Sequence, residues 1–265
     1  MASDVPAVTA AMRILESLVA AAPNAVSPGQ LVTEHQLNRS TCYNILAALQ
    51  RGGWATNKGD RAGWTLGPRL LALISGSGDL VLTLVQEELD RLSGDLGFVA
   101  MLTERGPAGD HVVVAKGERR AGVRVTVGVG DTFPFSAPAL MQATCAWLPD
   151  GEVDRLIAIH ELLRFTPNTV TDAAEARTLL ESVRERGYST SLRGQFNLDQ
   201  GAVAAPVFDH RGRVDRVVAI LAFPSDLRED NSEEVGSAVR ACADEITART
   251  GGVLPDAAGA AEESA

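Results

Sequence analysis

Apolar residues recur at three- and four-residue steps near the start of the chain, and this spacing predicts an amphipathic helix over residues 8–22. A short helix through Glu34 should follow, because the Ser-Pro-Gly-Gln run at 27–30 has the form of a capping box. The next helix is predicted from Arg39 to Gln50, with its apolar residues on one face. The glycine pair at 52–53 would end that helix.

Two strand patterns follow at residues 54–56 and 63–66, on either side of a polar turn, and together they predict a β-hairpin. Helix, short helix, tight turn, helix and hairpin is the element order of a winged helix-turn-helix. We therefore expect residues 1–67 to form a domain of this kind.

Beyond residue 67 the pattern indicates a linker and then a second domain. An apolar helical stretch over 70–74 precedes the Ser-Gly-Ser-Gly run at 75–78, which is the best linker candidate, and a helix over 79–93 follows it. Linker helices are therefore expected over 68–94 and the second domain over 95–250. The remaining residues, 251–265, are small, polar and acidic, and are expected to form a disordered tail.

The second domain mixes strand and helix patterns. Strands are predicted at 98–103, 111–115, 123–127, 203–208 and 214–223, and helices at 138–148, 150–163, 173–187 (capped by Asp172) and from Asn231, as the cap, to about Arg249. Consecutive strands joined by short turns favour an antiparallel sheet. The predicted fold class is α/β of the α+β kind, with an antiparallel sheet flanked by helices in a GAF-like arrangement.

Composition changes this picture in two ways. The 265-residue chain has a net charge of −10, yet residues 1–78 carry six Lys or Arg against four Asp or Glu, so a mildly basic head precedes an acidic body. The three cysteines are far apart and form no metal-ligand spacing with the four histidines, so neither a disulfide scaffold, a metal site nor a cofactor is expected. No apolar run is long enough for a membrane helix, and a cytoplasmic protein is expected.

The third helix has an outward face that suits the major groove of DNA. With its apolar residues toward the core, hydroxyl and amide side chains and a small alanine point outward, and Asn44 could read adenine through two hydrogen bonds. Cations at the hairpin tip would hold phosphate. The expected DNA-contacting residues are Arg39, Ser40, Thr41, Tyr43, Asn44, Arg51, Lys58 and Arg61. The alternative is an ordinary solvated helix face.

The chain resembles the IclR family of bacterial transcription regulators. The similarity lies in Ala11–Glu16, Asn38–Thr41 with Leu46–Leu49, Thr65–Leu73, Phe165–Thr171, Arg184–Tyr188 and Ala204–Asp209, in that order. This resemblance covers roughly residues 7–250. It implies that residues 95–250 bind a small organic effector, that the head binds operator DNA, and that the protein is a homodimer or a dimer of dimers.

Several positions depart from the family's pattern. Asn44 stands where the family usually has Arg, which leaves open a sensor with weakened DNA binding. Ala202 stands where members that bind small oxo-acids often have Cys, and Ile220 and Ala222 stand where they have serines. Because these changes remove hydrogen-bond donors, the expected effector is a larger, apolar aromatic acid or derivative. The alternative is that the substitutions only tighten the core and leave little cavity.

If the effector pocket lies between the sheet and the 133–141 loop, its predicted lining is Phe98, Met101, Phe135, Ser136, Leu140, Met141, Ala202, Ile220 and Ala222. An enzyme built on this domain is the third possibility, motivated by the pocket alone. Ser136 lacks a Gly-x-Ser-x-Gly setting and no partner His or Asp can be assigned from spacing. The sequence therefore predicts a regulator and no catalytic residues.

Overall fold

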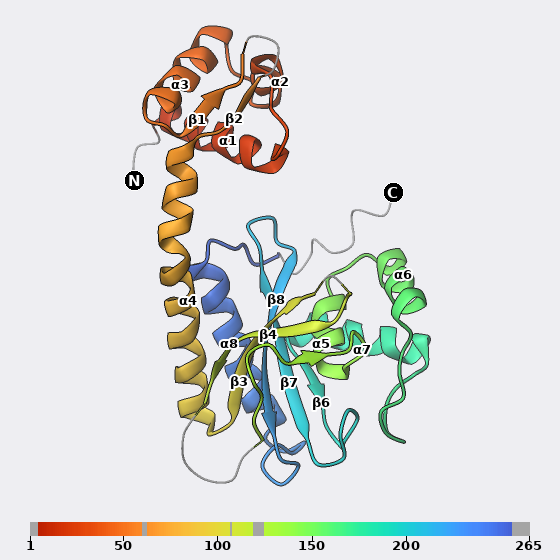
Figure 1. Ribbon diagram of the computed structural model, residues 1–265. Helices are drawn as coiled ribbons and strands as arrows, with labels where there is room; N and C mark the ends of the chain where they lie inside the picture. The colour runs from red at the N-terminus through yellow and green to blue at the C-terminus, as the bar shows by residue number, and fades with distance from the viewer. Residues whose placement is uncertain (1–4, 60–62, 107, 119–124, 256–265) are drawn as a thin grey trace. The chain divides into compact units, whose positions relative to one another are not determined.

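The computed structural model describes residues 5–59, 63–106, 108–118 and 125–255 of the chain (Figure 1). The backbone contacts divide it into two compact units, Met1–Leu80 and Val81–Ala265. The first unit contains the helices α1 (Pro6–Ala21), α2 (Pro28–Glu34) and α3 (Arg39–Arg51) and the two-stranded antiparallel sheet of β1 (Ala55–Asn57) and β2 (Trp64–Leu66). This order confirms the predicted winged helix-turn-helix.

Side chains cap the starts of α2 and α3, the first by the predicted capping box and the second by Asn38, which was not predicted as a cap. At the start of α2, the Ser27 hydroxyl accepts from the Gln30 amide at 3.2 Å, and the Gln30 side chain accepts from the Ser27 amide at 2.9 Å. At the start of α3, the Asn38 side chain accepts from the Thr41 amide at 2.7 Å. Both caps satisfy amides that a helix leaves without partners in its first turn. They set the directions in which α2 and α3 leave the turns.

One small core holds the three helices and the hairpin together. The fully buried side chains are Ile14 and Leu18 of α1, Leu31 of α2, and Cys42 and Leu46 of α3, with Ala55 and Trp64 of the hairpin beside them. The backbone of Val26 also pairs with Trp64. Because α3 contributes its Cys42 face to this core, its opposite face is left outside.

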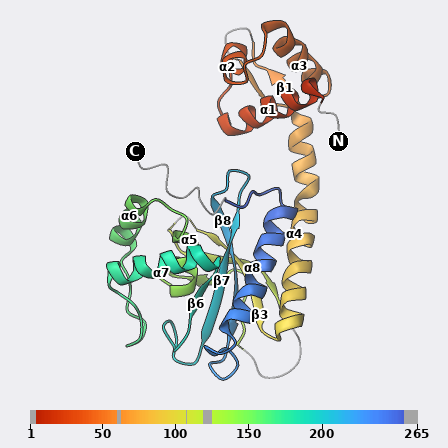
Figure 2. The same ribbon diagram turned by 180° about the vertical axis from the view of Figure 1, so that it is seen from behind.

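The second unit is built on a six-stranded antiparallel sheet of order β5-β4-β3-β8-β7-β6. The strands are β3 (Val99–Arg105), β4 (His111–Gly117), β5 (Thr132–Phe133), β6 (Ser189–Ser191), β7 (Gly201–Phe208) and β8 (Val214–Ala222). The helices are α5 (Pro138–Cys145), α6 (Asp150–His160), α7 (Ala173–Arg186), α8 (Ser232–Arg249) and the part of α4 (Pro68–Leu96) from Val81 onward. Within this unit, α4 and α8 cover one face of the sheet and α5 covers the other (Figures 1 and 2). The predicted α+β class is confirmed.

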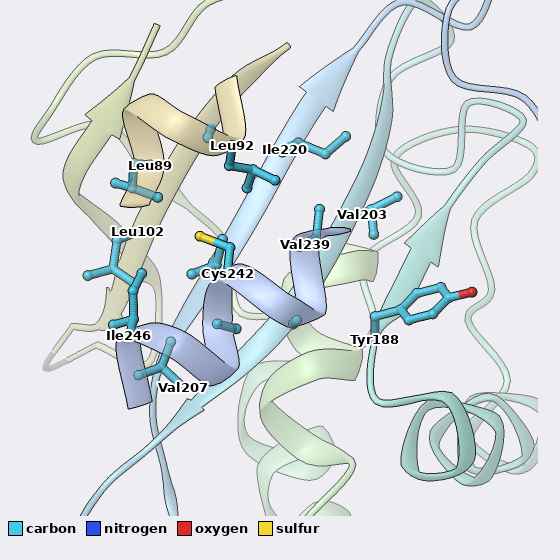
Figure 3. Close-up of a cluster of buried hydrophobic side chains, with 14 of the residues drawn as sticks. Leu89, Leu92, Leu102, Tyr188, Val203, Val207, Ile220, Val239, Cys242 and Ile246 are labelled. Carbon is cyan, nitrogen blue, oxygen red and sulfur yellow. The ribbon is translucent and has the colours of Figure 1, made fainter. Parts of the chain in front are cut away.

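Alternation along the strands divides the apolar residues between two cores. In β3, Ala100 and Leu102 pack against α4 and α8, whereas Val99 and Met101 pack toward α5. Figure 3 shows the first of these cores, in which Leu89 and Leu92 of α4 meet α8 and the sheet; Val239, Cys242 and Ile246 come from α8, and Leu102, Val203, Val207 and Ile220 come from the sheet. The strands β3, β7 and β8 are therefore buried on both faces along most of their length, which explains their nearly continuous apolar sequences, whereas β4 alternates between buried and half-buried residues.

Two predicted elements differ from the structure. No break occurs at 75–78, because α4 continues as one helix from Pro68 to Leu96. Residues 125–127 form no strand, and residues 123–124 lie outside the described residues. Val125 and Val127 are buried as their alternation suggests, but the Lys116 ammonium donates to the Val127 carbonyl at 2.9 Å, and β5 takes the edge of the sheet instead. The alternation of apolar residues over 123–127 therefore predicts burial correctly at Val125 and Val127, but not a strand.

Two further details differ from expectation. The Asn231 side chain accepts from the Arg228 amide at 2.8 Å and does not cap α8. The short edge strand β6 has no clear sequence signal and was not predicted. The predicted tail falls largely on residues 256–265, which lie outside the described residues.

The contact between α4 and β4 requires a glycine. A Cβ added at Gly117 would lie 2.3 Å from the Leu89 carbonyl oxygen and 2.4 Å from its carbon. Both of those atoms are backbone, so they cannot move aside as a flexible side chain would. The helix and the strand touch at this point with no side chain between them.

We expect Gly117→Ala to lower the free energy of unfolding by about 1–3 kcal/mol, because the added methyl forces α4 away from the sheet. Gly94→Ala is the control on the α4 side of this contact, since Gly94 lies in α4 and a Cβ there meets nothing within 4 Å. It should raise stability by up to about 1 kcal/mol through helix propensity. Urea denaturation of the full chain measures both, and equal effects of the two variants would contradict the close contact.

Candidate functional sites

The outward face of α3 is polar and open. Arg39, Ser40, Asn44 and Arg51 are exposed, as is Tyr43, while Thr41 is half-buried beside its N-cap. Neither Arg39, Arg51 nor Lys58 forms an ion pair with another residue in the described ranges. These cations therefore remain available to an anionic partner, and the side chains between them can reach a surface laid against the helix.

The hairpin that follows α3 in the sequence carries a further cation, Lys58. Lys58 follows β1 and is exposed, and the turn around it is held by the Asn57 side chain, which accepts from the Gly59 amide at 2.8 Å. Arg61, the other cation predicted at the hairpin tip, lies outside the described residues. The structure thus places seven of the eight predicted DNA-contacting residues.

An apolar concavity of about 650 Å³ lies between α1 and α3, and sequence reasoning missed it. Thr41 and Asn44 stand on its α3 side. Its lining is otherwise apolar or small: Ala7, Val8 and Ala11 of α1, Ile45, Ala48 and Leu49 of α3, and Gly52 and Trp54 after it. The signal that could have indicated it is a row of exposed apolar side chains, made up of Val5 just before α1 and of Val8, Met12 and Val19 along one side of the helix.

In the second unit, an apolar cavity lies between the sheet and the start of α5. Its lining consists of Met101, Phe133, Ala137, Pro138, Ala139, Leu140, Ser191, Phe196, Ala202, Ala219 and Leu221. Register explains why the strand residues meet, since Leu221 pairs with Ala202 and Ala202 with Ser191 across three neighbouring strands. The free space is about 30 Å³, room for about two water molecules.

Three of the nine predicted effector residues line this cavity, namely Met101, Leu140 and Ala202. Ile220 and Ala222 do not, because they point to the opposite face of the sheet and pack under α4 and α8. The prediction was wrong there by one residue: side chains alternate along β8, so Ala219 and Leu221 face the cavity. Neither carries a hydrogen-bond donor in its side chain, so the apolar character that was expected survives the correction.

The remaining predicted residues lie elsewhere. Phe98, just before β3, packs against the α4 and α8 core. Phe135 and Met141 belong to a separate cluster with residues of α6 and α7. Ser136 is buried, and its hydroxyl accepts from the Leu163 amide at 3.3 Å, so it holds the chain after α6. Phe135, Ser136 and Met141 do not line the cavity because their side chains lie on the side of the 134–136 segment and of α5 that faces α6 and α7 or the chain between them. Phe98 does not line it because it packs on the opposite face of the sheet.

Two phenylalanines that sequence reasoning missed cover the cavity. The Phe133 and Phe196 ring centroids are 5.9 Å apart, and Phe165 stacks behind Phe196 at 4.8 Å. The loop carrying Phe196 is held by the 166–169 turn: Thr166 donates to the Gly194 carbonyl at 2.7 Å and Thr169 to the Gln195 carbonyl at 2.6 Å. The Phe-Thr-Pro-Asn-Thr run was noted in the sequence, but its partner loop could be found only from the fold.

The arrangement defines a class of protein: a winged helix-turn-helix with an open polar recognition face, joined to an α+β unit with a cavity on its sheet. Residues 79–248 match the family model for the C-terminal domain of the bacterial transcriptional regulator IclR. The chain belongs to the IclR family of bacterial transcriptional regulators.

Known proteins along nearly the whole chain support this assignment. The chain is 25% identical over 259 residues to the transcriptional repressor IclR of Escherichia coli, covering 94% of this chain and 92% of that protein. It is 27% identical over 208 residues to the E. coli regulator XynR, covering 74% and 77%. A crystal structure of an IclR transcriptional regulator from Alicyclobacillus acidocaldarius superposes with a TM-score of 0.61 at 28% identity, covering 94% of this chain and all of that one.

These relatives are named as regulators of transcription and not as enzymes, in agreement with the prediction of no catalytic activity. Within the described ranges, no three His, Cys, Asp or Glu side chains gather as metal ligands. No helix in the same ranges is long and apolar enough to cross a membrane.

Proposed function

We propose that the protein is an effector-responsive regulator that binds operator DNA through α3 and a small, apolar, aromatic effector through its second unit. The observation that carries the proposal is the exposed polar face of α3, flanked by Arg39, Arg51 and Lys58, which form no ion pair with another described residue. Relatives named as repressors favour repression as the outcome of binding. Localisation in the cytoplasm follows from this role.

Side-chain chemistry separates the residues that could contact base edges from those that could contact phosphate. Tyr43 and Asn44 are exposed near the middle of α3 and can reach base edges, where an amide pairs with adenine through two hydrogen bonds. The Thr41 hydroxyl and the first-turn amides of Arg39 and Ser40 can hold phosphate oxygens, since the Thr41 amide already donates to Asn38. The Ser40 hydroxyl would join them by turning away from the Asn38 side chain, to which it donates at 2.9 Å. Arg39, Arg51, Lys58 and Arg61 would add charge without sequence preference.

We expect Asn44→Ala to cost about 1–3 kcal/mol in binding to the operator and less on random DNA, because only base reading depends on sequence. Asn24→Ala, at an exposed position after α1, is the matched control and should change neither. Electrophoretic mobility shift with DNA flanking the gene measures both. Equal losses on the two DNAs would mean that Asn44 does not read bases, and no operator binding at all would favour a sensor with weakened DNA contact.

We expect Lys58→Ala to weaken binding to operator and random DNA alike. Loss of one phosphate contact should reduce the slope of log affinity against log salt by about 0.9. Fluorescence anisotropy at several salt concentrations measures the slope. An unchanged slope would remove Lys58 from the interface.

The proposal of an aromatic effector is supported by the lining of the apolar cavity. Ser191 supplies the only hydroxyl among the eleven lining residues, and all the others are apolar. A small oxo-acid would find one donor there for three oxygens and would lose hydration without compensation. An aromatic ring would gain contacts with Phe133 and Phe196, although these two rings must separate because the free space holds only about two waters.

We expect Ala202→Leu to abolish effector binding by filling the cavity, while Ala174→Leu on the exposed side of α7 leaves it unchanged. Calorimetry with benzoate, benzamide and benzohydrazide, beside glyoxylate and pyruvate, tests the chemistry. Operator affinity of Ala202→Leu without ligand should equal that of the original chain. Binding of glyoxylate or pyruvate with no response to any aromatic compound would contradict the proposal.

A homodimer is the assembly that this role requires, because one recognition helix covers too few base pairs for a specific site. The exposed apolar residues Val8 and Met12 of α1 are candidate contacts. Light scattering at micromolar concentration should give at least twice the chain mass of 27.9 kDa. Val8→Lys with Met12→Lys should lower that value, and a monomer for the unaltered chain would count against the regulatory proposal.

A further inference from the structure

A second cavity, polar and separate from the apolar one, lies at the other end of α5. It has a volume of about 50 Å³ and is lined by Thr103, Glu104, Arg105, His111, Thr144, Leu148, Val214, Asp215, Arg216 and Val217. The first turn of α5 lines the apolar cavity, whereas Thr144, in its last turn, lines the polar one. No residue lines both cavities, so the two can be altered independently.

Thr144 indicates that this cavity is built to hold something. Its side chain is 8% exposed, and its hydroxyl oxygen is buried with no hydrogen-bond partner among the described residues. A buried hydroxyl without a partner is costly, so such groups normally meet a water or a ligand. The neighbouring hydroxyl of Thr103 is already used, since it donates to the Val217 carbonyl at 3.4 Å.

The charges around the cavity leave one cation without a counterion. Arg216 lies 3.2 Å from the Asp215 carboxylate and 3.9 Å from the Glu104 carboxylate, so its charge is compensated. Arg105 makes no ion pair with any described residue, and its guanidinium lies 5.8 Å from the centre of the Phe135 ring. A guanidinium is always protonated and presents a planar fork of donors that matches a carboxylate.

His111 adds no charge to the site at neutral pH. Its imidazole is buried, and burial lowers its pKa to about 4; the contact with the Phe135 carbonyl at 3.4 Å works against this shift, and nearby Arg105 adds to it. The charged groups facing it are therefore Arg105 and, more weakly, Asp110. An anion beside Arg105 would favour the protonated imidazole and raise this pKa.

We propose that this cavity binds a small monoanionic carboxylate, held by the Arg105 guanidinium and the Thr144 hydroxyl. The volume is that of about four water molecules, which limits the ligand to the size of formate or acetate. The carbonyl end of α5 disfavours an anion, but the Arg184 side chain donates to the Ala146 carbonyl there and offsets part of this effect. The proposal is independent of the aromatic effector and of DNA binding.

The test is a titration of the full chain, labelled with ¹³C at histidine, with sodium acetate at constant ionic strength. We expect one saturable shift, absent in His111→Gln, and a rise in the pKa of His111 when acetate is bound. Arg105→Gln should weaken binding roughly ten-fold and Thr144→Val severalfold, since each removes a donor to the carboxylate. Arg155→Gln is the matched control, because Arg155 is an exposed arginine on α6 that does not line the cavity. It should leave the acetate affinity unchanged.

Ala202→Leu separates this proposal from the effector site, because it should leave acetate binding intact while filling the apolar cavity. The titration extends to about 100 mM acetate, above the dissociation constant that a carboxylate site is expected to show. If no saturable shift occurs in that range, the cavity holds water only and the proposal is overturned. Equal acetate affinity in Arg105→Gln would also overturn it, as would an equal response to chloride.

Discussion

The alternation of side chains along the central strands is the constraint on which the second unit depends. β3, β7 and β8 are buried on both faces, so each successive residue belongs to a different core. One core joins the sheet to α4 and α8, and the other contains α5 and both cavities. A shift of a single residue moves a side chain from the ligand-facing side of the sheet to the side that holds α4.

This two-sided burial also makes residues of the two cores immediate neighbours along each strand. The residues that face the apolar cavity, such as Ala219, are neighbours in the chain of residues that face α4 and α8, such as Ile220. α4 begins in the first unit and ends in the second as one continuous helix. Close-packed cores transmit displacement because they cannot be compressed. A single layer of strands therefore separates the residues that line the apolar cavity from the core that contains α4 and α8.

The two cavities of the second unit differ in what lines them and in how rigidly the lining residues are held. The apolar cavity is covered by Phe133 of β5 and by Phe196, whose loop is held by hydroxyl contacts of the 166–169 turn, and the size of the cavity depends on the positions of the two rings. The polar cavity is bounded by strand residues and the last turn of α5, which are held by the sheet hydrogen bonds.

The sequence by itself determined the winged helix-turn-helix, the Ser27 cap of α2 and the outward face of α3, because these depend on contacts within a few residues: Ser27 with Gln30, and the 3.6-residue period that buries Cys42 and Leu46. It also indicated the α+β class and the family. Only the tertiary structure decided which strand residues face α5, since one residue of misplacement along β8 exchanges Ala219 for Ile220. It alone brought Phe196 over Phe133, and Thr144 near Arg105, because these pairs are separated by dozens of residues and meet only once the sheet register is set.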